Sequence, residues 1–164
     1  YTHQLSDLRL LDGVIEGLQS LLAVDYKVII ITNQSGIARG LFSTEEMHIF
    51  MRGLINVLLE NQINVTDYFY CPHHPKGKLL EYSIKCSCRK PEPGMLFAAE
   101  KKHNLDLSKS ILIGDRETDI IAGHDCGCKT ILMMNHTKAP NNSLSDFRVE
   151  NIIDATNIIL GDIN

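Results

Sequence analysis

The segment YKVIIITNQSGIARG, residues 26–40, decides the class of fold. Its first half is a β-branched run with apolar side chains at consecutive positions, which is typical of a parallel strand buried on both faces. Its second half is polar and glycine-containing, which indicates a loop at the end of that strand. Because a strand buried on both faces needs helices on either side, the segment predicts an α/β domain with a parallel sheet.

The rest of the chain continues this alternation of strands and helices. Apolar residues at helical spacing predict a helix over 12–24, and a capping box formed by Ser43 and Glu46 predicts the start of a helix that runs to about residue 61. The other expected elements are strands at 65–72, 108–115 and 129–134, helices at 93–104, 117–127 and 150–160, and a surface loop at 139–146.

The composition limits the class of function. The 164 residues are 44% hydrophobic and 22% charged, which suits one globular domain with a core. A net charge of −4 gives no electrostatic reason to expect a nucleic acid partner. The five cysteines are an odd number, which fits a reducing compartment better than a disulfide framework. We expect a cytoplasmic monomer with one three-layer α/β/α, Rossmann-like domain over residues 1–164, without a membrane span.

A first group of polar residues follows the predicted strand that ends at Thr32. The carboxyl ends of parallel strands are where such sheets bind ligands. The Thr32 hydroxyl and the backbone amides of Asn33, Gln34 and Ser35 could therefore form an anion site. These residue types are also common in ordinary turns, which is the alternative explanation.

A second group follows the predicted strand 108–115. Asp115 and Asp119 lie four residues apart, at the strand end and in the first turn of the next helix. Oxygen ligands in this arrangement suit a hard cation such as Mg²⁺. Helix capping is the alternative, because acidic residues are favourable at helix N-termini.

A third group combines cysteine and histidine. Cys71-x-His73 and Cys86-x-Cys88 supply four sulfur or nitrogen ligands in two close pairs, as structural Zn²⁺ sites require. His74 competes with His73, and the spacing alone does not decide between them. A disulfide between Cys86 and Cys88 would close a strained loop. A metal at this position would also fix the backbone of the two cations that follow, Arg89 and Lys90.

Taken together, the segments TNQSGIARG, CPHHP, CSCRKPEPGM and GDRETD resemble the motifs of the haloacid dehalogenase superfamily of phosphohydrolases. They are most similar to its branch of D-glycero-D-manno-heptose 1,7-bisphosphate 7-phosphatases, over about residues 12–135. The resemblance implies removal of the 7-phosphate of that sugar through an aspartyl-phosphate intermediate, with catalytic Mg²⁺ and structural Zn²⁺. It also implies a place in the synthesis of lipopolysaccharide or surface glycan precursors.

The resemblance implies a role for each matching residue. Thr32 would bind the phosphoryl oxygens and Lys90 would balance charge on the nucleophile and the phosphoryl group. Asp115 would bind Mg²⁺ directly, and Asp119 would lie next to the direct ligand without touching the ion. The substrate would contact Asn33, Gln34, Ser35, Arg89 and Arg116. The zinc ligands would be Cys71, His73, Cys86 and Cys88.

The superfamily's first motif, Asp-x-Asp-Gly-Thr, does not occur in the sequence. It supplies the nucleophile, and its strand lies between the strand ending at Thr32 and the strand ending near Asp115. Leaving those two edges unpaired would cost on the order of 1–3 kcal/mol for each buried group. We therefore expect that the sequence is N-terminally incomplete and that the first strand lies upstream of residue 1.

Two other functions remain open. Histidinol-phosphate phosphatases share the Gly-Asp-Arg motif and the zinc loop, which here is the segment of residues 71–88. They tend to lack SGIARG after TNQ. A non-catalytic, phosphosugar-binding homologue would explain the absent nucleophile.

Overall fold

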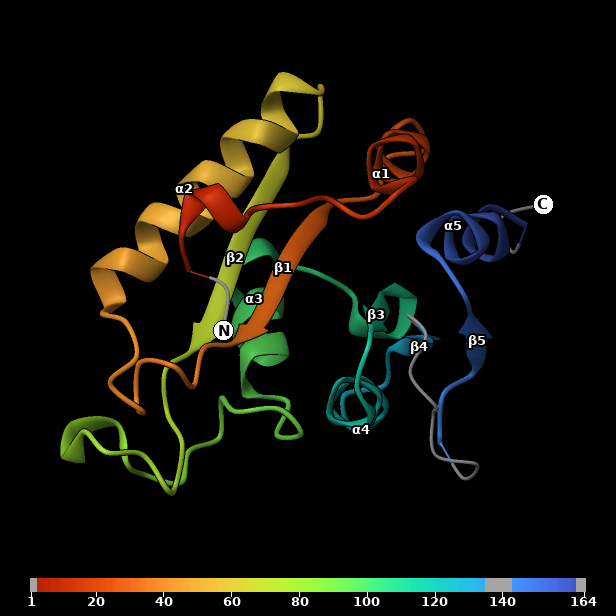
Figure 1. Cartoon of the computed structure of the whole chain (residues 1–164). Coiled ribbons are helices and arrows are strands. Elements are labelled where there is room, and N and C mark those ends of the chain that lie inside the picture. Colours follow the sequence, from red (N-terminus) through yellow and green to blue (C-terminus); the bar gives the residue numbers. More distant parts are fainter. Residues whose placement is uncertain (1–2, 135–142, 162–164) are drawn as a thin grey trace.

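The computed structural model describes residues 3–134 and 143–161, in which strands and helices alternate along the chain (Figure 1). The strands are β1 (Val28–Asn33), β2 (Val65–Cys71), β3 (Ile111–Gly114), β4 (Lys129–Met133) and β5 (Phe147–Val149). The helices are α1 (Val14–Leu22), α2 (Thr44–Glu60), α3 (Gly94–His103), α4 (Glu117–Asp125) and α5 (Ile152–Gly161). Short 3₁₀ turns occur at Leu5–Asp7, Leu80–Tyr82 and Leu107–Lys109.

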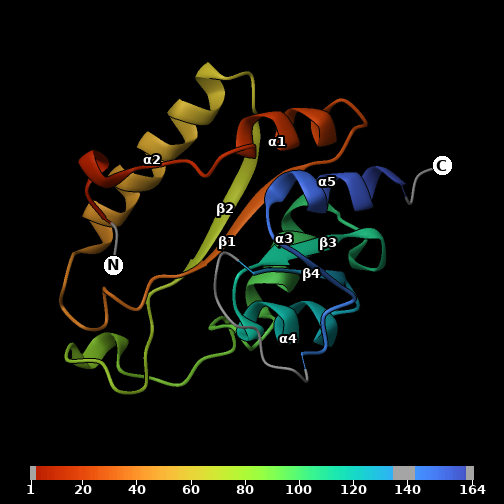
Figure 2. The same ribbon diagram turned by 45° about the vertical axis from the view of Figure 1, so that its right-hand side comes forward.

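Helices cover both faces of the strands, so the predicted three-layer α/β architecture is confirmed. On one face, α1, α2 and α5 pack on apolar side chains such as Ile30 of β1 and Ile131 of β4. On the other face lie α3 and α4, and Gly123 of α4 is in close contact with Leu112 and Thr130. Figure 2 shows α1 and α5 together on one side of β3 and β4, and α4 on the opposite side.

The strands form two separate parallel groups in the described part of the chain. β1 pairs with β2, from Val28↔Val65 to Asn33↔Cys71, and β3, β4 and β5 pair in that order. Between the two groups, β1 and β3 each have an edge that no described strand covers. Contacts between α1 and α5 connect the two halves, and Gly17 lets these helices approach closely at Thr156.

Several local expectations can be compared with the structure. The capping box is confirmed: Ser43 Oγ accepts from the Glu46 amide at 3.1 Å, and Glu46 accepts from the Ser43 amide at 2.7 Å. The first helix begins at Val14, two residues later than predicted, because Gly13 is in the left-handed region with φ of 78°. Helix α5 lies beside α1 and packs on β4 and on the edge strand β5.

Strand β5 was not predicted from the sequence. Of the predicted surface loop, residues 139–142 lie outside the described residues, and 143–146 are irregular and lead directly into β5. Three residues are too few to show a period-two pattern, and the strand is defined by its pairing with β4. None of the described helices has the length and hydrophobicity needed to cross a membrane.

Candidate active site

A cavity of about 950 Å³ opens at the carboxyl ends of β1 and β3. This is the end of a parallel sheet at which ligands are expected. Two of the three polar groups predicted from the sequence meet there, the one that follows β1 and the one that follows β3. The two cations that follow the Cys/His group, Arg89 and Lys90, also line the cavity. The lining is formed by Ile31–Ser35, Arg39, Arg89 and Lys90, and Ile113–Asp119.

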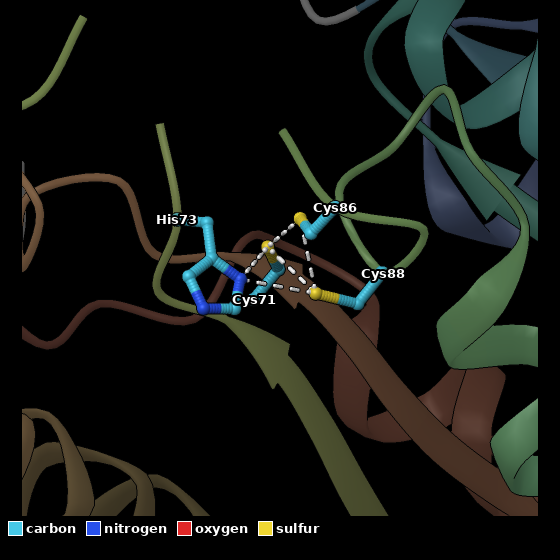
Figure 3. Close-up of side chains that lie close together, drawn as sticks. All are labelled: Cys71, His73, Cys86 and Cys88. Carbon is cyan, nitrogen blue, oxygen red and sulfur yellow. Dashed lines mark hydrogen bonds between the residues drawn. The ribbon is translucent and has the colours of Figure 1, made fainter. Parts of the chain in front are cut away.

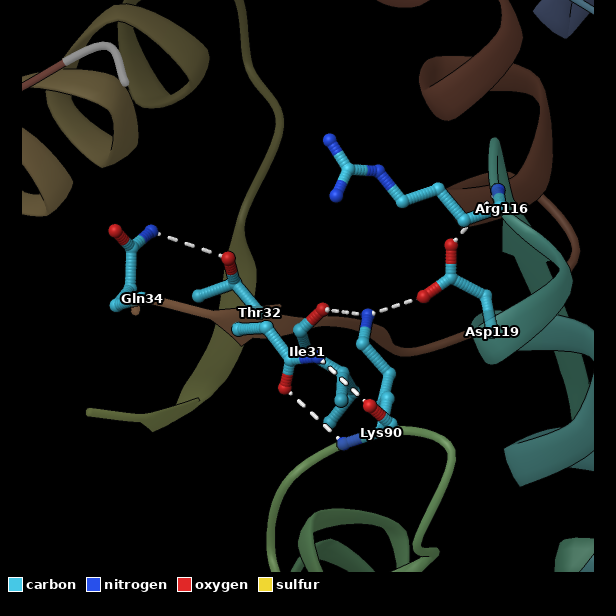
Figure 4. A network of polar contacts seen from close by, with 7 residues as sticks. Ile31, Thr32, Gln34, Lys90, Arg116 and Asp119 are labelled. Atoms are coloured by element: carbon cyan, nitrogen blue, oxygen red, sulfur yellow. Dashed lines mark hydrogen bonds and ion pairs between the residues drawn. The ribbon is translucent and has the colours of Figure 1, made fainter. Parts of the chain in front are cut away.

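The ammonium group of Lys90 is held by two polar contacts in the cavity wall (Figure 4). It lies 2.7 Å from Asp119 Oδ1 and donates to the carbonyl oxygen of Ile31 at 2.8 Å. Only 11% of the Lys90 side chain and 7% of the Asp119 side chain are exposed. An ion pair this well buried is poorly screened by solvent, so it fixes the Lys90 ammonium at one place on the cavity wall.

Asp119 can reach Lys90 because α4 approaches β3 very closely. A Cβ atom on Gly114 would lie 2.3 Å from the Asp119 Cβ, so a side chain at position 114 would displace the carboxylate. The second Asp119 oxygen accepts from the Arg116 backbone amide at 3.1 Å and thereby caps the helix. The capping explanation given by the sequence for Asp119 therefore applies, and the other carboxylate oxygen is engaged by Lys90 in the cavity wall.

The side chain of Asn33 holds the backbone of Lys90. Its Nδ2 donates to the Lys90 carbonyl at 3.0 Å, and its Oδ1 accepts from the Lys90 amide at 3.1 Å. This reciprocal pair joins the end of β1 to the segment that carries Lys90. The amide group of Asn33 is thus occupied in positioning the lysine, which the sequence could not indicate across 57 residues.

The loop after Thr32 differs in detail from the predicted anion site. The Gln34 backbone amide donates to the Cys71 carbonyl at 2.8 Å, so it is unavailable to an anion and that part of the prediction was wrong. The Gln34 side chain instead donates to Thr32 Oγ1 at 3.1 Å. Ser35 is buried. Thr32 keeps its hydroxyl proton available to an incoming oxygen, because its oxygen is the acceptor in this contact.

Asp115 and Arg116 lie at the carboxyl end of β3 and are both exposed to the cavity. Figure 4 shows the Arg116 side chain extending away from Asp119, which contacts only its backbone. The exposed Asp115 carboxylate fits a Mg²⁺ ion that keeps several waters and takes one or two protein carboxylates. Glu117 also lines the cavity, and its buried Oε2 has no hydrogen-bond partner among the described residues.

The four predicted zinc ligands come together in the structure (Figure 3). The sulfurs of Cys71, Cys86 and Cys88 lie 3.1–3.5 Å apart, and His73 Nδ1 lies 3.6 Å from Cys71 Sγ and 3.4 Å from Cys88 Sγ. Tetrahedral zinc with bonds of about 2.3 Å to sulfur separates its ligand sulfurs by roughly 3.8 Å. The cluster needs to expand only slightly around such an ion, so the donor set fits zinc.

The structure separates the two neighbouring histidines. His73 turns its ring toward the three sulfurs, whereas His74 contacts Arg39 and the Lys76 amide. Burial is the main cause that raises the pKa of the Cys71 thiol, followed by its contact with Cys88. A buried thiol in this state gives up its proton only when a cation compensates the thiolate.

The cluster is connected to the cavity through the segment that follows it. Arg89 Nη1 donates to the His73 carbonyl at 3.1 Å, so one of the ligand residues also holds this guanidinium. The Gly94 amide donates to the Ser87 carbonyl at 2.9 Å, and a Cβ at Gly94 would lie only 2.3 Å from that oxygen. These contacts fold residues 87–94 into a tight turn that presents Arg89 and Lys90 to the cavity.

Two residues of the cavity were missed by reasoning from sequence, Arg39 and Glu117. Arg39 lies in the quoted SGIARG segment, but nothing in a linear pattern shows that its side chain turns back toward the cavity. Glu117 looked like an ordinary acidic residue in the first turn of a helix.

Comparisons with known proteins agree with this arrangement. A family model described as HAD-hydrolase-like matches residues 87–155. The chain is 35% identical over 164 residues to D-glycero-beta-D-manno-heptose-1,7-bisphosphate 7-phosphatase of Pasteurella multocida, covering 98% of this chain and 89% of the relative. It is 42% identical over 127 residues to the corresponding alpha-named phosphatase of Photorhabdus laumondii, covering 77% of this chain and 69% of the relative.

A solved structure shares the fold over almost the whole chain. The D,D-heptose 1,7-bisphosphate phosphatase of B. bronchiseptica, crystallised with magnesium and phosphate, superposes with a TM-score of 0.81 at 25% identity. The match covers 99% of this chain and 89% of that structure.

A parallel sheet that gathers a threonine, a lysine and an aspartate at its carboxyl edge is the arrangement of the haloacid dehalogenase-like phosphatases. Within that class, the chain belongs to the family of heptose 1,7-bisphosphate 7-phosphatases.

Proposed function

We propose that the protein is a Mg²⁺-dependent phosphomonoesterase that removes the 7-phosphate of D-glycero-D-manno-heptose 1,7-bisphosphate. The observation that carries this proposal is the meeting of Thr32, Lys90 and Asp115 around one cavity. Phosphoryl transfer depends mainly on positioning and on stabilisation of negative charge. A hydroxyl donor, a fixed ammonium and a carboxylate that can hold Mg²⁺ are suited to that task, and the named relatives support the choice of substrate.

Each residue then has a role that follows from its position. Thr32 donates its hydroxyl proton to a phosphoryl oxygen, and Lys90 stabilises the charge that develops there. Asn33 and Asp119 position Lys90, from its backbone and its ammonium respectively. Asp115 would hold Mg²⁺, which would supply charge neutralisation at the phosphoryl oxygens.

The loop after β1 and the exposed cations would contact the substrate. Gln34 and Ser35 come from that loop, and Arg89 and Arg116 also line the cavity. A guanidinium group binds phosphate oxygens through two parallel hydrogen bonds, which suits these positions.

The cluster of Cys71, His73, Cys86 and Cys88 would hold a structural Zn²⁺. All four protein ligands come from side chains, which leaves no open position for a catalytic water. The ion would fix the turn that carries Arg89 and Lys90. Five free cysteines are consistent with a reducing compartment, so we place the protein in the cytoplasm.

The nucleophile would come from one further parallel strand between β1 and β3. Both strands present an uncovered edge there, and their ends already form the cavity. A strand inserted parallel to both would place its carboxyl end beside Lys90 and Asp115. An aspartate at that end would be positioned to form the aspartyl-phosphate. We therefore propose that residues 1–164 are most of a single phosphatase domain that this strand completes.

Steady-state phosphate release by the whole purified protein tests the proposal. With Mg²⁺, we expect a higher kcat/KM for heptose 1,7-bisphosphate than for histidinol phosphate, and no turnover after addition of a chelator such as EDTA. Preference for histidinol phosphate would assign the protein to that related activity. Binding of the heptose bisphosphate without any Mg²⁺-dependent turnover would identify a non-catalytic homologue and overturn the proposal.

A further inference from the structure

We propose that Arg39 determines specificity for substrates that carry a second phosphate, by binding the phosphate group that is not removed. The inference rests on the proposed function and assigns a residue to one end of the substrate. Arg39 comes from the loop after β1, whereas Lys90 and Asp119 form their pair on the wall between β1 and α4.

The backbone that carries Arg39 is held firmly. The Arg39 amide donates to the Ser35 carbonyl at 3.1 Å, which folds the loop back on itself. The preceding carbonyl, that of Ala38, accepts from the amides of Lys78 at 2.7 Å and Leu79 at 3.0 Å. The zinc loop thus clamps the loop after β1, and the Arg39 guanidinium starts from a fixed position on the cavity rim.

The guanidinium has at least one donor without an acceptor among the described residues. Arg39 Nε is buried and has no hydrogen-bond partner among the described residues. Its Nη2 lies 3.1 Å from His74 Nε2, but His74 Nδ1 accepts from the Lys76 amide at 3.1 Å. A neutral imidazole accepts at only one ring nitrogen, so His74 can accept from Arg39 or from the Lys76 amide but not from both. A phosphate oxygen beside Arg39 would supply the acceptor that this arrangement lacks.

The charge around Arg39 points to the same ligand. The ammonium of Lys90 is neutralised by Asp119, whereas neither Arg39 nor Arg89 has a carboxylate partner within ion-pair distance among the described residues. Arg89 Nη1 is held by the carbonyl of His73, beside His74, so both guanidinium groups contact the same turn of the zinc loop. Two uncompensated guanidinium groups are suited to a phosphate dianion.

The size of the cavity allows both ends of one substrate to be bound. A volume of about 950 Å³ is far more than a single phosphate needs, and it is at the upper end of the range for small-molecule sites. One phosphate would meet Thr32, Lys90 and Asp115, and the other would meet Arg39 with Arg89. Substrates with a single phosphate would leave Arg39 without its ligand.

The test compares two substrates that differ only in the second phosphate, heptose 1,7-bisphosphate and the corresponding heptose 7-phosphate. For Arg39→Gln in the whole protein, kcat/KM for the bisphosphate should fall about 10- to 100-fold, which is the usual cost of losing a charged hydrogen-bond donor. Hydrolysis of the 7-phosphate should change less than about threefold. Arg39→Lys should give an intermediate loss of kcat/KM for the bisphosphate, because it keeps the positive charge but cannot form the bidentate hydrogen bonds of a guanidinium group.

Lys78→Gln is the matched control, since Lys78 is an exposed cation on the same loop that does not line the cavity. Its kinetics and those of the wild type should agree for both substrates, and all variants should have similar melting temperatures. An equal loss on both substrates with Arg39→Gln, or no loss on either, would overturn the inference.

The proposed function and this inference can fail separately. Turnover by the wild type with an unchanged preference in Arg39→Gln would refute only the inference. Without any turnover by the wild type, calorimetric titration with the same two sugar phosphates replaces the kinetic readout. Arg39→Gln should then weaken binding of the bisphosphate alone, and equal affinities of variant and wild type would reject the assignment.

Discussion

Replacing Asp119 by Asn should lower the free energy of unfolding by about 3 kcal/mol. Removal of one partner from a buried ion pair typically costs about 3–5 kcal/mol, because the remaining charge stays buried without compensation. The lower end applies here, since the Lys90 ammonium keeps its bond to the Ile31 carbonyl and is 11% exposed. Asn also keeps an oxygen to accept from the Arg116 amide. For a chain of this length, the loss corresponds to a fall in Tm of roughly 6–12 °C.

Urea unfolding followed by circular dichroism measures the effect, with Asp119→Asn, Lys90→Met and the double variant as a double-mutant cycle. The double variant should be more stable than the sum of the single losses predicts, by on the order of 2 kcal/mol, because it leaves no unpaired charge. Asp125→Asn is the control, since this carboxylate ends the same helix and is exposed; it should stay within about 0.5 kcal/mol of the wild type. A loss below about 1 kcal/mol for Asp119→Asn, together with additive single effects, would refute the reasoning.

Three further changes test other parts of the structure. Cys88→Ser should reduce the zinc content of the purified protein below one ion per chain by mass spectrometry, while Cys126→Ser keeps it; full retention of zinc by the first variant would contradict the assigned site. Gly114→Ala should lower stability by about 2 kcal/mol or more in thermal melts, because its Cβ would lie 2.3 Å from that of Asp119; a wild-type Tm would show that α4 can move away. The Thr130 backbone amide, and then its hydroxyl, lower the pKa of Asp146, so this carboxylate stabilises the fold above its unfolded pKa of about 3.9, and the contribution disappears as the pH falls through the folded pKa. Asp146→Asn should therefore differ most from the wild type at neutral pH and least in acid, and a difference independent of pH in urea titrations would contradict this assignment.

The parts of the structure that could be predicted from the sequence are those whose causes lie within a few neighbouring residues. The β-branched run of β1 and the capping box of α2 were visible because their causes lie within a few residues. The four residues of the Cys/His cluster were visible for a similar reason, since the members of each pair are only two residues apart. Spacing alone did not separate His73 from His74, and only the family resemblance favoured His73; the structure agrees, because the His73 ring turns toward the sulfurs.

The features that escaped prediction all depend on contacts between distant segments. The Gln34 amide is used by Cys71 on the neighbouring strand, which removes it from the expected anion site. Asn33 holds Lys90 across 57 residues. The direction of Arg39 depends on the zinc loop, through the carbonyl of Ala38. A linear pattern contains the residue types for these contacts but not the pairing that brings them together.

The uncovered edges of β1 and β3 have a consequence for how the chain behaves in isolation. Each edge presents a row of backbone donors and acceptors, and such rows are templates on which other chains add strands. A polypeptide of these 164 residues should therefore self-associate at high concentration. A short synthetic β-strand peptide that fits between the two edges should suppress that association and restore cooperative unfolding, as in fragment complementation.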